Sequence, residues 1–368
     1  MSSFRGPEAF PLFHLIARRS RAAREAIVIT LLVLLAVVDI ATSADLSFLD
    51  FYFLPVLLAC WYLGRREGIA VAFASVVAWT LDDLAAHRHY SHVAIPIWNR
   101  AVDLSFFLFL SWLVGALKTA HENEIRARTE RLEHDLAIAR DVQTALLPPR
   151  RQDDDHYAVA AEYRQAFGVG GDAYDLVNLE GHALAVSIAD VSGKGLPAAL
   201  LMASFGASLR GLLSVRGDHL DLLAAELSER LRASLASRRF VTAFIGIAED
   251  GVLRYVNAGH EAALLVGPQG AQPLSSTGPV LGLLPGARFQ EERVPFPPGS
   301  FLVLFTDGVT ECVNPRGEEL GRDRVAQVVA DGPAEPADVV AELLRAVEAH
   351  AAGEPFQDDV TILCVRRR

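Results

Sequence analysis

Four long apolar runs fill the first third of the chain, and short polar segments separate them. The runs are Ala26–Thr42, Phe48–Gly64, Gly68–Leu84 and Ala101–Leu117. A helix needs about 17–25 mostly apolar residues to cross a bilayer, so each run is long enough for one span. A buried helix of a soluble domain explains any single run, but four in succession favour the membrane. The pattern therefore predicts a four-helix transmembrane domain over residues 1–118.

Basic residues mark one side of this domain. They precede the first run, fill the turn after the second and follow the fourth: Arg18, Arg19, Arg21, Arg24, Arg65, Arg66, Lys118 and Arg126. The first loop on the other side, SADLSFLD, has no Lys or Arg. Because loops rich in Lys and Arg stay in the cytoplasm, both termini are expected there, with the chain in the inner (plasma) membrane. Asp39 and Asp103 lie within the runs, would be costly against lipid, and are expected to face the bundle interior.

A polar helix is predicted to follow the membrane domain. Residues 119–147 contain no Gly or Pro until Pro148 and Pro149, and apolar residues recur every seven positions (Ile125, Leu132, Ala139, Leu146). Thr129 and Gln143 interrupt the companion stripe. The pattern predicts a coiled-coil-like linker over 119–149 through which the chain forms a homodimer. A helix packed on its own domain is the alternative.

Beyond the linker, short strand patterns alternate with amphipathic helices. Strands are predicted at HALAVSIAD, VTAFIGIAE, GVLRYVNAG, AALLV, SFLVLFTD and VTILCVR from their β-branched and aromatic residues. Helices are predicted at Leu196–Ser214, Asp218–Ser237, Arg322–Ala330 and Ala337–Ala351. Short turns between strands favour antiparallel sheets, which helices then cover. Residues 150–368 are therefore predicted to form one α+β domain.

The net charge and the spacing of the cysteines argue against nucleic-acid binding, a disulfide framework and a zinc site. From Thr119 onward, 24 Lys and Arg face 36 Asp and Glu. Such an acidic domain is a poor binder of nucleic acid. The three cysteines form no CxxC pair, which argues against a disulfide framework or a zinc site and fits a reducing compartment.

Acidic residues stand where the predicted strands end or begin. Asp190 ends one strand, Asp307 ends another, and Asp358 with Asp359 precedes the last. Asp172 follows two glycines in VGGDAYD. Neighbouring antiparallel strands share an edge at such points, so these acids can converge. Oxygen ligands without nearby His or Cys favour Mg²⁺ or Mn²⁺.

Seven sequence blocks, in this order, resemble the PP2C-type (PPM) metal-dependent serine/threonine phosphatases. They are DVQTALLPP, GGDAYD, ADVSGKGLPAAL, FVTAFIGIAE, LRYVNAGHEAALLV, LVLFTDGVTE and DDVTILCV. The resemblance is closest to the bacterial SpoIIE/RsbU-like branch, which acts on anti-anti-sigma factors. It implies an α-β-β-α sandwich of two antiparallel sheets. Upstream, LDFYFLPVLLACWYLGRREG resembles the multi-pass membrane sensor modules that precede bacterial signalling domains.

The resemblance also implies a centre of two Mn²⁺ or Mg²⁺ ions that activate water, with no protein nucleophile. Asp190 matches the acid that bridges the two ions, and the Val191 carbonyl a further ligand. Asp307 and Asp358 match ligands of the second ion. Asp172 matches an acid that contacts the ions directly or through water. Asp359 ranks below Asp358, because relatives outside this branch carry Asn there.

Two further residues of these blocks are assigned lesser roles. Lys194 is interpreted as a solvated turn residue, with a substrate contact as the alternative. His260 is interpreted as structural, and no residue is assigned as a general acid.

The sequence as a whole thus predicts a membrane-anchored protein serine/threonine phosphatase. Its expected substrate is a phosphorylated STAS-type anti-anti-sigma factor in a partner-switching pathway. Two alternatives remain open. A diguanylate cyclase is suggested by GGDAYD, although Ala173 and Tyr174 replace that family's Glu-Phe pair. An inactive phosphatase-fold scaffold is the other, which the intact set of acids disfavours.

Overall fold

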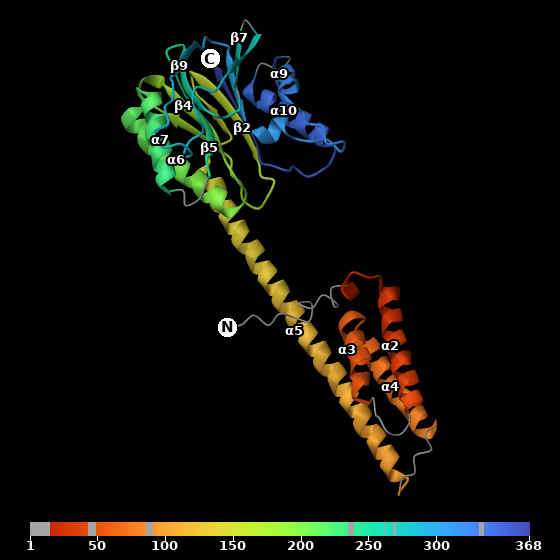
Figure 1. Ribbon diagram of the computed structural model, residues 1–368. Coiled ribbons are helices and arrows are strands. Elements are labelled where there is room, and N and C mark those ends of the chain that lie inside the picture. The colour runs from red at the N-terminus through yellow and green to blue at the C-terminus, as the bar shows by residue number, and fades with distance from the viewer. Residues whose placement is uncertain are drawn as a thin grey trace. The chain divides into compact units, whose positions relative to one another are not determined.

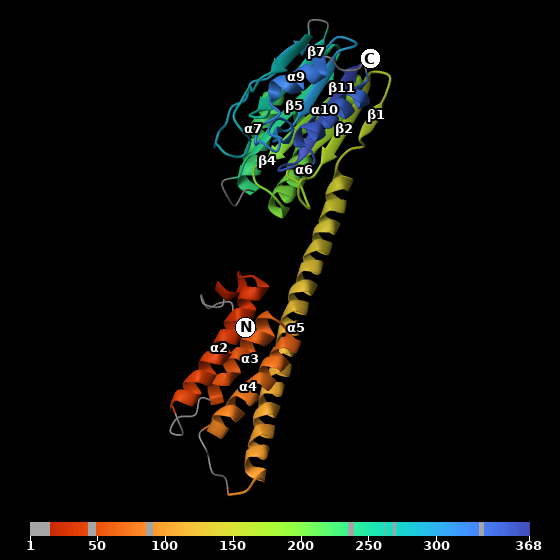
Figure 2. The same ribbon diagram turned by 90° about the vertical axis from the view of Figure 1, so that its right-hand side faces the viewer.

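The computed structural model describes residues 15–42, 49–85, 91–234, 239–261, 263–267, 270–330 and 335–368. The chain forms two compact units, Met1–Glu130 and Arg131–Arg368, which Figures 1 and 2 show in two views. The domain boundaries expected from the sequence (118/119 and 149/150) remain predictions. Residues 43–48 of the first outside loop lie beyond the described residues.

The N-terminal unit is helical. Its described elements are α2 (Arg21–Thr42), η3 (Leu49–Tyr52), α3 (Phe53–Tyr62), α4 (Arg65–Ala85) and α5 (Ala94–Leu146), which continues into the second unit. The second apolar run forms a shorter α-helix than predicted, because its described start, Leu49–Tyr52, is a 3₁₀ turn and only the ten residues of α3 are α-helical before Gly64 at φ 133°. An α-helix rises about 1.5 Å per residue, so α3 alone is too short for a span.

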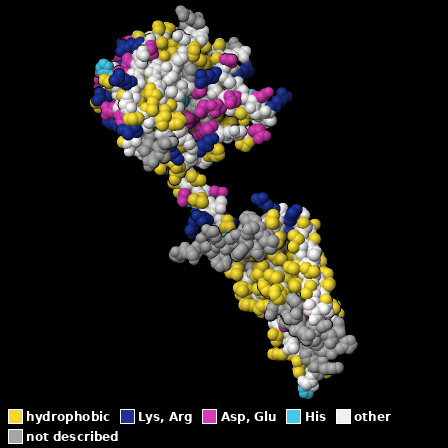
Figure 3. All heavy atoms as spheres, in the orientation of Figure 1, with side chains coloured by type: hydrophobic (Ala, Val, Ile, Leu, Met, Phe, Trp, Pro, Cys, Tyr) yellow, Lys and Arg dark blue, Asp and Glu magenta, His cyan; other side chains and the backbone are white. Residues whose placement is uncertain are grey.

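The surface of the N-terminal unit is largely apolar (Figure 3). Along α2, for example, Ile29, Val33 and Val37 are each more than half exposed. Asp39 instead is buried, at 2% exposed, and the Asp103 side chain is 13% exposed beside Arg100. Both acids thus avoid the outer surface, as the sequence predicts. Outward apolar and inward ionisable side chains are the arrangement of a membrane bundle.

Three described helices are long and apolar enough to cross a membrane: α2, α5 and α6 (Leu196–Arg216). The last belongs to the second unit, where Met202, Phe205 and Leu209 pack it into a hydrophobic core. Its apolar character is therefore explained by packing on a sheet.

The second unit contains two antiparallel sheets. One has the strand order β1-β2-β11-β10-β7-β8 and the other β3-β4-β5-β6-β9. The strands of the first are β1 (Arg151–Asp153), β2 (Tyr157–Arg164), β7 (Ala263–Gly267), β8 (Gly270–Leu274), β10 (Phe301–Phe305) and β11 (Val360–Arg367). Those of the second are β3 (Ala173–Asn178), β4 (Leu184–Val191), β5 (Val241–Glu249), β6 (Val252–Ala258) and β9 (Glu292–Pro295).

The alternation of side chains along each strand explains how the layers stack. In β4, Leu184, Val186 and Ile188 enter the core between the two sheets, whereas Ala185 and Ala189 face the helices. Since successive side chains point to opposite faces, one strand serves both layers. Helices α6 and α7 (Leu220–Ser234) cover the second sheet, and α9 (Arg322–Ala330) and α10 (Pro336–Ala351) cover the first (Figure 1). The predicted α-β-β-α sandwich is confirmed.

The C-terminal end of α5 corrects one element of the linker prediction. Gln143 is not a weak position in a coiled-coil stripe; it is 4% exposed, and its amide donates to the Gly170 carbonyl at 2.6 Å. This end of the helix packs on its own domain. Ile125 and Leu132 remain more than half exposed. A homodimer through the part of α5 that contains Ile125 and Leu132 stays a prediction, and light scattering of the full chain would test it.

Candidate metal centre

The register of the second sheet places two of the predicted acids opposite each other. Strands β3 and β4 pair with Ala173 opposite Ala189. Asp172 and Asp190 therefore lie across from one another one step further along the antiparallel ladder. Asp190 lies two residues after Ile188 in β4, so the two side chains are on the same face of the strand. The Asp190 side chain therefore points toward the interior of the sandwich, at the end where the two sheets open.

The first sheet brings the other acids to the same end. Phe305 of β10 pairs with Ile362 of β11, and the four-residue helix α8 (Asp307–Thr310) begins directly after β10. Gly308 makes the close approach possible, because a Cβ at this position would lie 2.0 Å from the Asp359 carbonyl oxygen. The backbone at Asp307 therefore lies against the segment that carries Asp358 and Asp359.

Hydrogen bonds fix the two most buried acids. Asp172, 2% exposed, accepts at Oδ2 from the Thr306 hydroxyl at 2.7 Å and the Thr361 hydroxyl at 2.5 Å. Asp359, 4% exposed, accepts from the Ala166 N–H at 2.9 Å through Oδ1 and from the Gly171 N–H at 2.7 Å through Oδ2. Each side chain is thus held in one orientation by donors from other elements.

Asp358 has a different environment from its neighbour. Its side chain is 48% exposed, and Oδ2 lies 2.8 Å from the Lys194 ammonium. Both oxygens of Asp359 already accept backbone N–H groups, whereas Asp358 can exchange an exposed ion pair for a metal at little cost. Asp358 as the preferred ligand stays the prediction made from the sequence, and the backbone N–H bonds hold the Asp359 side chain in place. The Lys194 side chain is 49% exposed, in accord with the solvated turn residue expected from the sequence, and it also donates to the Gln357 carbonyl at 2.5 Å.

The acids affect one another electrostatically. Burial, together with the charges of Asp307, Asp358 and Asp359, raises the pKa of Asp190 to about 7. Burial and the charges of Glu311 and Asp358 raise the pKa of Asp307 to about 6.

The pKa of Asp172 is shifted for the same reasons. Its pKa is raised well above the ordinary value by burial and by the charges of Asp190 and Asp359. Carboxylates gathered in this way repel each other, and a divalent cation relieves that repulsion.

The donors present fit Mn²⁺ or Mg²⁺. A Cβ on Gly171 would lie 3.0 Å from the Val191 carbonyl oxygen and 3.6 Å from Asp190 Oδ1. Both oxygens therefore lie close to Gly171, and oxygen donors suit hard cations. Within the described residues, no group of three or more His, Cys, Asp or Glu side chains is placed to hold a metal ion.

His260 is a buried residue that contacts the strand next to Asp190. It is 7% exposed, and its Nδ1 is 2.9 Å from the hydroxyl of Thr242, the residue that pairs with Asp190 in the sheet. Burial lowers the pKa of His260 to about 4, so the ring is neutral at physiological pH. These contacts accord with the structural role expected from the sequence.

Sequence reasoning missed the residues that hold the acids in place. Thr306 and Thr361 were read only as parts of strands. The sequence pattern places Gln143 in the linker, although this residue also belongs to DVQTALLPP, one of the seven blocks of the family resemblance. Its Oε1 accepts from the Gly170 N–H at 3.1 Å, next to the loop that binds Asp359. A polar residue that is buried at the end of a helix is visible only once the fold is known.

The raised pKa values predict how stability depends on pH. A carboxyl whose pKa is higher in the folded than in the unfolded chain (about 4) stabilises the fold fully below the unfolded value. That contribution is lost as pH rises through the folded pKa, about 6 for Asp307 and about 7 for Asp190. We expect the melting temperature of the chelated protein to fall between about pH 5 and pH 8, as measured by scanning fluorimetry.

Metal should reverse this fall. Mn²⁺ binds the ionised carboxylates, so it is expected to raise the melting temperature strongly at about pH 8 and little at about pH 5. Asp190→Asn removes one titrating group and should flatten the metal-free profile. A Mn²⁺ effect of equal size at both ends of the pH range would contradict the assignment.

Comparison with known proteins identifies relatives of this unit. The family model described as Stage II sporulation protein E (SpoIIE) matches residues 180–368. The phosphoserine phosphatase RsbU of Bacillus subtilis is 23% identical over 290 residues, which cover 77% of this chain and 86% of RsbU. Protein IcfG of Synechocystis sp. is 28% identical over 285 residues, which cover 70% of this chain but only 45% of that protein.

Solved structures agree on the fold. The SiaA-PP2C domain of Pseudomonas aeruginosa aligns with a TM-score of 0.58 at 20% identity, over 65% of this chain and 98% of that domain. The RsbU and RsbW domains of Rv1364c from Mycobacterium tuberculosis align with a TM-score of 0.50 at 27% identity, over 58% of this chain and 62% of that structure.

Proposed function

This chain belongs to the SpoIIE family of PP2C-type serine/threonine phosphatases, and from that premise we propose that it is a membrane-anchored phosphatase that hydrolyses phosphoserine or phosphothreonine on a signalling protein. The observation that carries the proposal is the set of acids at one open end of the sandwich. The negative charges of Asp307, Asp358 and Asp359 are close enough to raise the pKa of Asp190. Oxygen donors gathered in this way suit a two-metal hydrolase.

Each residue of the centre has a part in this proposal. Asp190, Asp307, Asp358 and the Val191 carbonyl would hold the metal ions. Asp172 and Asp359 orient the site through their hydrogen bonds to Thr306, Thr361 and the 166–171 loop. Mn²⁺ or Mg²⁺, when bound, supplies the Lewis acidity that activates water and neutralises the phosphoryl group. No cysteine or serine nucleophile is required.

The substrate class rests on the relatives. RsbU carries the name phosphoserine phosphatase, and the SpoIIE/RsbU-like branch that the sequence resembles acts on anti-anti-sigma factors. We infer that the substrate is a phosphorylated STAS-type protein. Incubating the purified full chain with such a protein and following its phosphoserine on a phosphate-affinity gel tests this. Failure to dephosphorylate it, with activity retained on p-nitrophenyl phosphate, would show that the substrate is another phosphoprotein.

The membrane placement is a proposal as well. The apolar surface of the N-terminal unit and the lengths of α2 and α5 support it. With four spans, reporter fusions after Arg66 and Lys118 read as cytoplasmic, whereas one near His89, which lies outside the described residues, reads as external. An external reading at Lys118 would overturn the topology and put the phosphatase on the wrong side for a cytoplasmic substrate.

A further inference from the structure

A groove begins at the acid centre and runs away from it along the surface of the catalytic unit. Its volume is about 780 Å³, and Asp358 and Gly308 line the end nearest the centre. That volume lies in the range, about 300–1,000 Å³, of pockets that take whole drug-sized ligands. A phosphoryl group alone leaves most of it unfilled, so the groove can take chain on one side of a phosphorylated residue.

The first wall of the groove is a hairpin that follows α8. Leu320 N–H donates to the Cys312 carbonyl at 2.9 Å, and Val313 forms a bridge with Glu319. The Asn314 side chain accepts the N–H groups of Arg316 and Glu318 at its tip. These bonds make the wall a preformed surface.

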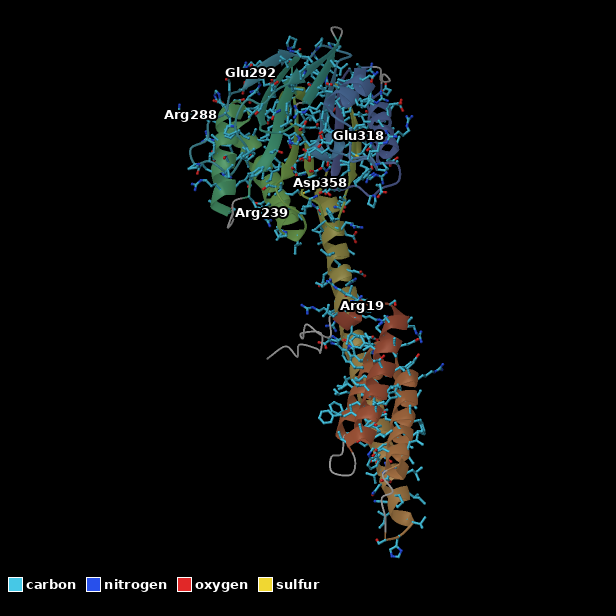
Figure 4. All side chains as sticks on the ribbon, turned by 45° about the vertical axis from the view of Figure 1, so that its right-hand side comes forward. Arg19, Arg239, Arg288, Glu292, Glu318 and Asp358 are labelled. Carbon is cyan, nitrogen blue, oxygen red and sulfur yellow. The ribbon has the colours of Figure 1, made fainter. Side chains whose placement is uncertain are left out.

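The second wall is the segment between α10 and β11. Ala352 and Gly353, at φ 52° and 91°, end the helix and turn the chain toward Asp358. The two walls are joined, because His350 Nε2 lies 2.8 Å from the Glu318 carbonyl oxygen. Figure 4 labels Glu318 and Asp358, one from each wall.

The lining of the groove combines apolar surface with unpaired acid. Phe167 is 49% exposed, and Phe356 lines the groove beside Asp358. Glu311 and Glu354 are exposed, and among the described residues neither carboxylate has an ion-pair partner within 4.0 Å. Lys194 is a cation of the lining and donates to the Gln357 carbonyl, so the two exposed carboxylates face one lining ammonium. Acidic side chains gather on this face of the unit beside α9 and α10 (Figure 3).

We propose that this groove binds the polypeptide segment that flanks the phosphorylated serine or threonine, with an apolar side chain against Phe167 and Phe356 and a Lys or Arg facing Glu311 and Glu354. The inference rests on the proposed phosphatase function and specifies its substrate. An exposed acid without a partner attracts a cation, and complementary charge across a contact gives specificity. The groove shares Asp358 and Gly308 with the acid centre, so one bound segment can reach both.

The test compares substrates that differ only in the flanking charge. Two phosphoserine peptides share apolar neighbours, and one carries Lys and the other Glu at the positions around them. The wild-type full chain in detergent should have a kcat/KM for the Lys peptide about tenfold above that for the Glu peptide, mainly through KM. Glu354→Gln should reduce the difference, since Glu311 remains, and Glu354→Lys should abolish or reverse it.

Two controls separate this inference from the function on which it rests. p-Nitrophenyl phosphate reaches the metal centre without filling the groove, so its hydrolysis shows for each variant how far the metal centre itself is affected, and the peptide ratio is compared with it. Glu180→Lys changes an exposed acid before the opposite end of β4 from Asp190 and should leave the peptide preference unchanged. An unchanged Lys/Glu ratio in Glu354→Lys would overturn the groove assignment, whereas a wild type inactive on every substrate would overturn the phosphatase itself and this inference with it.

Discussion

Replacing Asp190 or Asp307 by Asn is expected to abolish phosphatase activity while the catalytic unit stays folded. Each change removes a negative oxygen ligand from a position that the sheets have already built. Loss of an outer-shell partner of a metal site typically costs about 10–100-fold in activity, so loss of a ligand should cost more than about 100-fold. Steady-state assays with p-nitrophenyl phosphate and saturating Mn²⁺ measure the effect.

The same variants report on stability. Burial and neighbouring charge raise the pKa of Asp190 to about 7, so the neutral Asn relieves repulsion in the metal-free protein at neutral pH. The melting temperature of the metal-free Asp190→Asn variant should equal or exceed that of the chelated wild type. Asp323→Asn is the matched control, since Asp323 is exposed in the first turn of α9 and should keep full activity. Wild-type turnover in Asp190→Asn would show that the metal assignment is wrong.

Gly308→Ala is expected to cause the second largest loss, and for a steric reason. The new Cβ would lie 2.0 Å from the Asp359 carbonyl oxygen, so the backbone that carries Asp307 has to move away from Asp359. Overpacking of this kind costs about 1–3 kcal/mol of stability. Displacement of the ligand should lower kcat by more than about 10-fold even where the variant folds, because catalytic geometry tolerates only small displacements.

Gly206→Ala provides the comparison for this variant. It makes the same substitution in helix α6, where a Cβ would meet nothing within 4 Å. Ala is favoured over Gly inside a helix by about 0.5–1 kcal/mol, so this variant should be as stable as the wild type or more so. If Gly308→Ala were as active and stable as Gly206→Ala, the close approach of the two segments would not exist.

The acids were predictable from the sequence because they end strands with strong patterns. LVLFTD is an apolar run that stops at Asp307, and SIAD stops at Asp190 in the same way. Strands β4, β5, β6, β7, β10 and β11 match the predicted runs, and α9 matches its predicted bounds. Such runs are long and rich in β-branched or aromatic residues, so local preference and tertiary burial agree.

Other elements carried a weaker signal. Strand β2 reads YAVAAEYR, in which alanine replaces the β-branched residues that mark a strand. It lies between β1 and β11 because the hydrogen bonds of its neighbours require a partner there. Gln143 was misread for a related reason. A heptad pattern records which residues share a helix face, and only the tertiary structure shows that Gly170 occupies the space beside this one.

The central claim is that these acids form a metal-dependent phosphatase centre, and one assay tests it most directly. The purified full chain is stripped with EDTA, and its activity on p-nitrophenyl phosphate is followed as Mn²⁺ or Mg²⁺ is returned, beside a cyclase assay with GTP. We predict no hydrolysis in EDTA, recovery with metal, and no cyclic dinucleotide at any metal concentration. Full phosphatase activity in excess EDTA, or synthesis of a cyclic dinucleotide from GTP, would contradict the account.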